Sequence, residues 1–143
     1  MSAETSKVEP AVSEGPQVKL RTEWLAKSLV DRKVESCQTS RPELEPFIPS
    51  IVGSRIEACF CKGKHIFIRF ECGLHLHNHL LMRGCWRKLD GQLLFLPAGA
   101  WLGIYVGPHT ICNYNGQMLR FASEDEVRDT MSTLGPDTMR EPY

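Results

Sequence analysis

The chain has 143 residues, of which 42% are hydrophobic and 24% are charged, a composition typical of one soluble globular domain with its own core. Its 17 basic and 17 acidic side chains cancel, which argues against nucleic-acid binding driven by bulk charge but leaves room for a local basic face. No apolar run approaches the roughly 18 residues that span a bilayer, and residues 1–12 lack the features of a secretory signal or a transit peptide. We therefore expect a cytoplasmic protein, nucleoid-associated or nuclear depending on its source, with no membrane partner.

Six cysteines are many for this length, yet none of them forms a C-x-x-C pair. A zinc finger or ribbon is therefore not expected. Four of the cysteines lie in apolar segments, where a reduced thiol packs as a small core residue. Reduced core thiols are the first expectation, with disulfides and a metal site as alternatives, for Cys37, Cys59, Cys61, Cys72, Cys85 and Cys112.

The first third of the chain predicts an arm, a helix and a turn region. Residues 1–12 are polar and contain two prolines, which predicts a disordered arm. From Gln17 to Val30 apolar residues recur at helical spacing after Pro16, and this pattern predicts an amphipathic helix with Lys19, Arg21 and Lys27 off its apolar stripe. Residues 34–39 alternate as a strand. The proline-rich segment 42–52 suits a short helix or turn that packs the apolar side chains of Leu44, Phe47, Ile48 and Ile51.

The rest of the chain predicts a β-rich fold. Gly, Asn and Pro separate short strand-like runs, and Asp90-Gly91 and Asn115-Gly116 are strong hairpin signals. Ser123 opens an S-E-D-E capping box, and the helix that it begins ends near Leu134. The sequence therefore predicts a mainly β protein, a two-layer antiparallel β-sandwich with an N-terminal and a C-terminal helix. The expected strands cover residues 55–61, 65–72, 74–81, 85–89, 93–96, 101–106, 110–115 and 118–122.

The segment CKGKHIFIRFECGLHLHNHLLMRG, residues 61–84, holds most of the candidate functional side chains. Lys62 and Lys64 flank a glycine at the entry to a strand, with His65 directly after them. Basic groups on a turn with little bulk approach a phosphate closely, which suits contact with a DNA backbone. A solvated hairpin turn is the simpler alternative.

Three histidines follow at alternate positions, so one face of the strand carries His75, His77 and His79. Imidazoles at this spacing could share a metal ion, but no carboxylate is placed by spacing to complete such a site. Packing or hydrogen bonding is the preferred interpretation, and no metal is expected. Met82, at the end of the strand, is either a core residue or an apolar wedge that projects from the surface.

Four short segments occur together in one order: E-G-P-Q-V at 14–18, K-G-K-H-I-F-I-R-F at 62–70, H-L-L-M-R-G at 79–84 and L-G-P-D at 134–137. In these segments the chain resembles the N-terminal domain of the formamidopyrimidine-DNA glycosylase / endonuclease VIII family, over residues 13–139. Enzymes of that family excise oxidised bases and nick the abasic site that remains. Their nucleophile is the α-amine of the N-terminal residue, usually proline, which forms a Schiff base with the sugar C1′.

The resemblance implies a role for each matching residue. Ser13 would supply the amine if it were exposed as an N-terminus, Glu14 would act as acid and base at the sugar, and Lys64 would contact the phosphate beside the lesion. Met82 would fill the gap left by the flipped nucleotide. The remaining implied contacts with damaged double-stranded DNA come from Lys62, His65, His79 and Arg83. No cofactor is implied for this chain, because the zinc finger of the family lies beyond the matching part.

Two departures from the family bear on catalysis. In the printed sequence Ser13 is bonded to Val12, and an amide nitrogen cannot form a Schiff base. Another translation start or proteolysis would expose the amine; otherwise the domain is catalytically silent. We expect residues 140–143 to begin a linker to helix–two-turn–helix and zinc-finger parts that the sequence does not contain.

These departures leave several functions open. The first is a base-excision-repair glycosylase and abasic-site lyase domain, incomplete by itself. The alternatives are a silent binder of damaged DNA, a fragment that needs a separate partner chain to supply the C-terminal half, and a β-sandwich interaction module with no nucleic-acid role. The sequence identifies neither the preferred lesion nor the oligomeric state.

Overall fold

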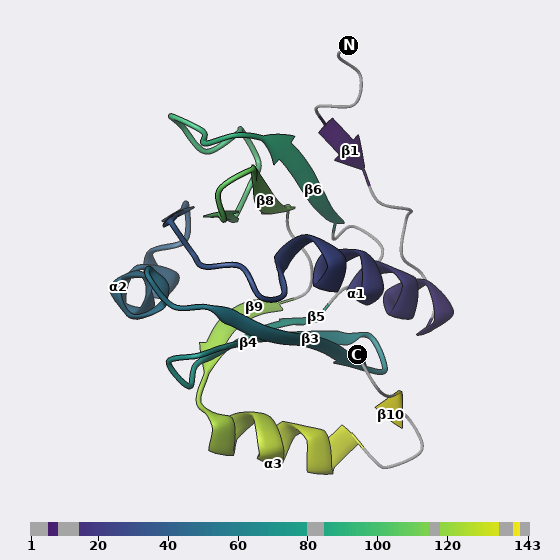
Figure 1. Ribbon diagram of the computed structural model, residues 1–143. Helices are drawn as coiled ribbons and strands as arrows, with labels where there is room; N and C mark the ends of the chain where they lie inside the picture. Colours follow the sequence, from purple (N-terminus) through teal and green to yellow (C-terminus); the bar gives the residue numbers. More distant parts are fainter. Residues whose placement is uncertain (1–5, 9–14, 80–84, 115–117, 135–138, 141–143) are drawn as a thin grey trace.

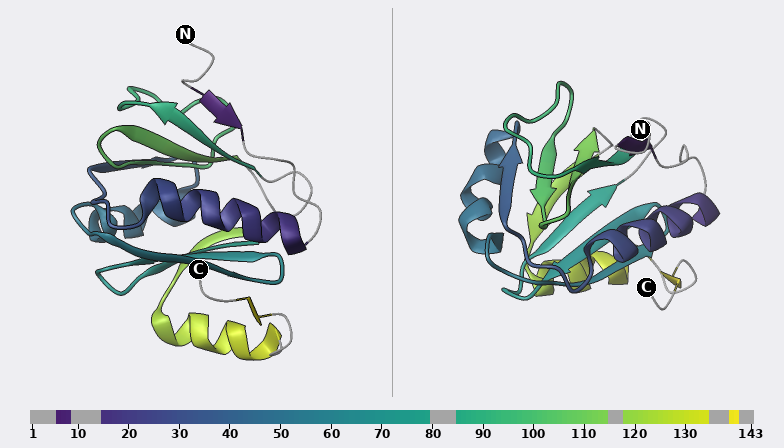
Figure 2. Two further views of the ribbon diagram at one scale, coloured as in Figure 1. Left: turned by 45° about the vertical axis from the view of Figure 1, so that its right-hand side comes forward. Right: turned by 45° about the horizontal axis from the view of Figure 1, so that its top comes forward.

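The structure, a computed structural model, describes residues 6–8, 15–79, 85–114, 118–134 and 139–140. Its strands form two five-stranded sheets in which all neighbouring strands are antiparallel. The sheets lie as two layers, with α1 between them at one side and α3 outside the second layer (Figures 1 and 2). The predicted two-layer antiparallel sandwich with a helix near each end is confirmed.

The first sheet contains, in spatial order, β1 (Ser6–Val8), β6 (Cys85–Asp90), β8 (His109–Tyr114), β7 (Leu102–Tyr105) and β2 (Ser36–Thr39). The second sheet contains β10 (Met139–Arg140), β3 (Ile56–Lys62), β4 (His65–Phe70), β5 (His75–His79) and β9 (Met118–Ala122). The helices are α1 (Gly15–Leu29), the 3-10 helix η2 (Pro42–Phe47), α2 (Ile48–Ile51) and α3 (Glu124–Leu134). No helix among the described residues is both long enough and apolar enough to cross a membrane.

The predicted capping box opens α3. The backbone N–H of Glu126 donates to Ser123 Oγ at 3.2 Å, and the backbone N–H of Ser123 donates to Glu126 Oε1 at 2.8 Å. This reciprocal pair satisfies two donors that a helix start leaves unpaired. It places the beginning of α3 directly after β9.

A polar contact inside the core joins the two sheets. Trp86 of the first sheet is fully buried, and its indole N–H donates to Asn78 Oδ1 of the second sheet at 3.1 Å. The amide of Asn78 in turn donates to the carbonyl of Met118 at 2.8 Å. Because Asn78 is itself 1% exposed, these hydrogen bonds take the place of water around it.

The buried face of α1 differs from the predicted one. Arg21 is 1% exposed, whereas Leu20 is 58% exposed, so the expectation that Arg21 lies off the apolar stripe is wrong. Arg21 precedes Leu25 and Leu29 by one and two helical turns and shares their buried side. The aliphatic stem of an arginine packs against apolar neighbours, and tertiary packing here decides which side of the helix is buried.

Two further expectations are corrected. Residues 1–12 were expected to be disordered, but Ser6–Val8 pairs with β6 as an edge strand; the other arm residues lie outside the described part. Residues 93–96 form a loop and no strand. The amide of Gln38 holds this loop by donating to the carbonyl of Leu93 at 2.9 Å, and Leu94 and Phe95 point into solvent with 89% and 82% exposure.

The cysteines whose side chains are described are free thiols. Cys59, Cys61 and Cys112 are buried, as expected for reduced core thiols, whereas Cys72 is exposed. Burial raises the pKa of Cys59 to about 12, so its thiol stays protonated and unreactive at neutral pH. Cys85 begins β6, and its side chain lies outside the described part.

Replacing Asn78 with alanine should destabilise the protein because the indole N–H of Trp86 would lose its acceptor inside the core. A buried polar group without a partner costs about 1–3 kcal/mol. Urea denaturation followed by tryptophan fluorescence measures this loss. Gln92→Ala is the matched control, since Gln92 makes an exposed 3.3 Å hydrogen bond to Ser36, and its effect should stay within about 0.5 kcal/mol. Equal losses in the two variants would contradict the inter-sheet role.

Candidate functional site

The predicted site residues fall into two groups. Ser13, Glu14, Met82 and Arg83 lie outside the described residues. The others, Lys62, Lys64, His65 and His79, lie at one end of the second sheet, around the turn between β3 and β4. The start of α1 lies at this same end of the molecule (Figures 1 and 2). The fold therefore brings the helix that follows Glu14 to the end of the sandwich that carries the lysines.

The K-G-K turn, Lys62–Lys64, is a tight connection. Lys62 pairs with His65 across the two strands, so Gly63 and Lys64 alone form the loop. Gly63 has a φ of 61°, in the left-handed region that glycine enters without a steric cost. This geometry, with glycine first in a two-residue hairpin loop, suits the right-handed twist of the strands. It leaves Lys64 half-buried at the tip.

The two lysines of this turn have different surroundings. Lys62 is 4% exposed, and its ammonium donates to the carbonyl of Met131 in the last turn of α3. Carbonyls at a helix C-terminus lack partners within the helix, and a cation there also interacts favourably with the helix dipole. A DNA contact by Lys62 stays a prediction, and it would require the ammonium to leave Met131.

The histidines lie on the outer face of the second sheet, together with Arg120. His65 Nδ1 and His77 Nε2 are 2.8 Å apart and share a hydrogen bond. The ring of His65 stacks on that of His79, with a centroid distance of 4.1 Å and an angle of 9°. On the other side of His77, Arg120 Nε donates to Nδ1 at 3.5 Å. The expected packing and hydrogen-bonding role of these histidines is confirmed for His77 and His79.

These rings are neutral at physiological pH. Burial lowers the pKa of His77 to about 3, helped by the charges of His65, Arg120 and His79. Burial, followed by the charge of His79, lowers the pKa of His65 to about 4. For His79 burial is again the first cause of a lowered pKa, and the Lys64 ammonium is the second.

His77 offers no free ring nitrogen to a metal ion. Both ring nitrogens of His77 are occupied by hydrogen bonds to His65 and Arg120, so neither presents a free lone pair to an ion. Among the residues that the structure describes, no group of three or more His, Cys, Asp or Glu side chains is arranged to hold a metal.

Sequence reasoning missed the role of Arg120. The sequence places Arg120 only within the expected strand 118–122, whereas the structure pairs Arg120 with His77 across β9 and β5. Finding this pair requires knowing that β9 lies beside β5, which residue spacing does not reveal. The burial of Lys62 was missed for a similar reason, because its acceptor belongs to a helix 69 residues further on.

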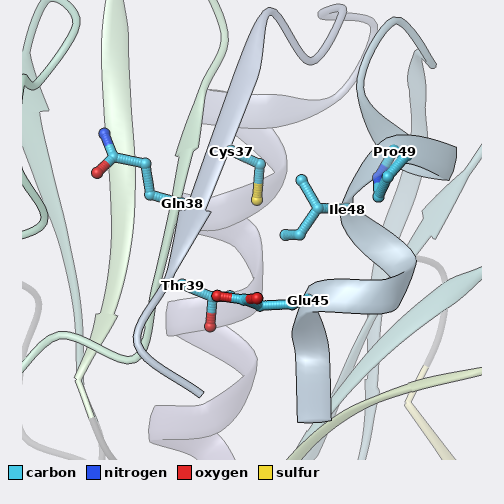
Figure 3. Close-up of a pocket in the computed structure, with 6 residues that line it drawn as sticks. All are labelled: Cys37, Gln38, Thr39, Glu45, Ile48 and Pro49. Carbon is cyan, nitrogen blue, oxygen red and sulfur yellow. The ribbon is translucent and has the colours of Figure 1, made fainter. Parts of the chain in front are cut away.

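A hollow lies away from the K-G-K turn, between β2 and the helices η2 and α2 (Figure 3). It measures about 370 Å³ and is lined by Cys37, Gln38, Thr39, Glu45, Ile48 and Pro49. Burial, with the charge of Cys112 as a smaller cause, raises the pKa of the Cys37 thiol to about 12. A thiol with so high a pKa is a poor nucleophile, so this hollow holds no evident catalytic group.

Comparison with known protein families shows to which family the chain belongs. A family profile described as the formamidopyrimidine-DNA glycosylase N-terminal domain matches residues 12–127. The chain belongs to this family. The matched range begins within one residue of the predicted start at Ser13 and ends inside α3.

Individual relatives agree with this membership. The chain is 26% identical over 77 residues to endonuclease 8 of Klebsiella pneumoniae (strain 342), covering 54% of this chain and 29% of the relative. It is 19% identical over 129 residues to endonuclease 8 of Salmonella arizonae, covering 88% of this chain and 49% of the relative. The chain thus spans about half, or less, of the length of these relatives.

Solved structures share the fold. Lactococcus lactis Fpg (MutM), in a complex with DNA that contains N7-benzyl-Fapy-dG, superposes with a TM-score of 0.73 at 19% identity, covering 84% of this chain and 47% of that one. The Lactococcus lactis Fpg bound to DNA with an abasic site gives a TM-score of 0.74 at 19% identity, with 85% and 47% coverage.

Lys62→Met should destabilise the protein more than Lys64→Met, because only Lys62 gives its ammonium to a helix terminus. Losing a hydrogen bond from a charged group costs about 1.5–3 kcal/mol, whereas a change at the half-exposed turn should stay within about 0.5 kcal/mol. Chemical denaturation at pH 7.5 measures both. A larger effect at Lys64 would show that the assignment of the two lysines is reversed.

His77 should make stability depend on pH. Its pKa is lower in the folded state than in the unfolded state, so the unfolded chain takes up the proton first. The stabilisation is complete above pH 6.5 and is lost as the pH falls toward 3. Between pH 6.5 and 5 the loss should be about 1.5 kcal/mol.

Because other groups also titrate in that range, the His77→Gln variant provides the control. Glutamine offers a donor and an acceptor but does not titrate there. Urea denaturation at pH 5, 6 and 7.5 should therefore show a shallower pH dependence in the variant. Parallel curves for the two proteins would contradict the buried neutral ring.

Proposed function

We propose that this chain forms the catalytic N-terminal part of a DNA glycosylase with abasic-site lyase activity, acting on oxidised bases in damaged double-stranded DNA. The family membership of residues 12–127 carries the proposal. It is supported by the K-G-K turn, which matches a segment of that family and lies at the same end of the fold as the start of α1.

The chemistry would begin at the α-amine of Ser13. An α-amine has a pKa of about 8, so a useful fraction is neutral and nucleophilic at working pH. Its nitrogen would form a bond to the sugar C1′ as the damaged base leaves with the bonding electrons. Loss of a proton from that nitrogen and opening of the sugar ring at the C1′–O4′ bond, with O4′ taking up a proton, would then give the Schiff base. Glu14 would transfer protons at the sugar. Elimination from this adduct would then cleave the strand.

Lys64 would hold the DNA backbone during these steps. Its side chain leaves a turn whose glycine lets the backbone approach closely, and an ammonium pairs readily with a phosphate oxygen. The chain spans about half the length of its endonuclease 8 relative from Salmonella arizonae. A separate chain that supplies a C-terminal half would be a partner of this domain and would add further DNA contacts.

One observation favours a second function, a silent binder of damaged DNA. The chain continues upstream of Ser13, and Ser6–Val8 pairs with β6. In this form the Ser13 nitrogen is an amide and has no nucleophilic lone pair. The domain would then recognise damage through the K-G-K turn without cutting.

Borohydride trapping on an oligonucleotide with an abasic site separates these functions. The chain as printed is compared with a version that begins at Ser13, because reduction converts a Schiff base into a stable covalent adduct. We expect an adduct with the shortened version alone. Circular dichroism first verifies that removing β1 leaves the shortened version folded.

The matched control is the shortened version with its amine acetylated, which should give no adduct. An adduct with the full-length chain would overturn the assignment of the amine. No adduct with either version, together with retained binding to the abasic DNA, would favour the silent binder.

A further inference from the structure

Arg120, His77 and His65 form a directed row of hydrogen bonds, here called the histidine row, across β9, β5 and β4. A guanidinium can only donate, so Arg120 Nε at 3.5 Å requires the lone pair of His77 Nδ1. A neutral His77 then carries its proton on Nε2. His77 donates that proton to His65 Nδ1 at 2.8 Å. Because Arg120 can only donate, each hydrogen bond in the row is donated in the direction from Arg120 to His65.

The row fixes the tautomer of His65. Because Nδ1 of this ring accepts, its own proton must be on Nε2. Among the described residues no acceptor takes up that N–H. The stack on His79, 4.1 Å between centroids, fixes the plane of the ring. His65 is half-exposed and directly follows Lys64. Its Nε2–H is therefore a hydrogen-bond donor, in one defined tautomer, beside the basic turn.

Helix α3 anchors the other end of the row. Arg120 Nη2 donates to Thr130 Oγ1 at 3.5 Å, and that hydroxyl donates to the backbone carbonyl of Glu126 at 2.9 Å. The hydrogen bond from the Ser123 backbone is the main cause that lowers the pKa of the Glu126 carboxyl, and the Arg120 charge is a smaller one. The guanidinium is thus held between the sheet and the helix.

We propose that Arg120 and His77 are positioning residues that hold His65 as a neutral N–H donor for a phosphate oxygen of bound DNA, beside Lys64. The inference rests on the proposed DNA-binding function and deepens it. Lys64 would supply charge, and His65 would supply a directional hydrogen bond. A neutral donor displaces no counterion, so the two residues should leave different signatures in the salt dependence of binding.

The charges around His65 agree with a neutral ring. Lys62 on β3, Lys64 in the turn and Arg120 on β9 are cationic residues of this region. Burial is the first cause that lowers the pKa of His65 to about 4, and the charge of His79 is the second. Lowering the pH from 7.5 to 6 should therefore not strengthen DNA binding through His65.

The first experiment measures binding to a duplex with a tetrahydrofuran abasic analogue, by fluorescence anisotropy at pH 7.5 between 50 and 200 mM salt. Lys64→Ala should reduce the slope of log affinity against log salt by about 0.9. His65→Phe, which keeps an aromatic ring for the stack, should weaken binding about tenfold with the slope unchanged. If His65→Phe reduced the slope by about 0.9, His65 would contact DNA as a cation. If His65→Phe left the affinity unchanged, His65 would make no contact with DNA. Either result overturns the proposal.

The second experiment tests the positioning role without DNA. Nitrogen-15 NMR of the imidazoles should show His65 and His77 with their protons on Nε2. Arg120→Met should shift the rings of His65 and His77 toward a mixture of tautomers and should weaken DNA binding. Arg120→Lys keeps a donor, so it should preserve the tautomers and the DNA binding of the unchanged protein. The control is Arg69→Met, because Arg69 pairs with Glu57 at 3.1 Å on the same sheet face but outside the row.

Different results would contradict the positioning role and the donor role. Unchanged tautomers in Arg120→Met overturn the positioning role, whatever the DNA result. Correct tautomers in a wild-type chain that does not bind abasic DNA overturn the donor role together with the proposed function, and leave the histidine row as a purely structural feature.

Discussion

One buried amide, that of Asn78, sets the relation between the two sheets. It accepts a hydrogen bond from Trp86 of the first sheet and donates one to the backbone of β9. Since side chains alternate along a strand, fixing Asn78 inward fixes its neighbours His77 and His79 outward. The polar contact in the core and the histidine row beneath α3 therefore lie on opposite faces of the same strand, and a slip of one residue would exchange them.

Local pattern was enough to predict much of this fold. Alternation revealed β4 and β5 and placed the histidines on one face, and the S-E-D-E box gave the start of α3. What pattern could not supply was strand order. His77 and Arg120 lie 43 residues apart, and they meet only because β9 returns beside β5. The burial of Arg21 was missed because apolar spacing assigns a face without knowing what packs against it.

The K-G-K turn contains two lysines with different structural surroundings. Lys62 is used to close the end of α3, while Lys64, two residues later, stays at the surface. In the sequence the two lysines are equivalent, and only the register of the hairpin distinguishes them. The outer face of the second sheet thus carries a lysine that contacts α3, a lysine at the surface, and imidazoles kept neutral by burial.

Because β1 precedes Ser13 in the chain, removing the residues before Ser13 also changes which strand forms the edge of the first sheet. A chain that begins at Ser13 lacks Ser6–Val8 and leaves β6 as an outermost strand, with its backbone amides and carbonyls unpaired along one side. Open strand edges recruit other strands and promote self-association. The shortened form, whose free amine the proposed chemistry requires, would therefore have a longer unpaired stretch of β6 and a greater tendency to aggregate.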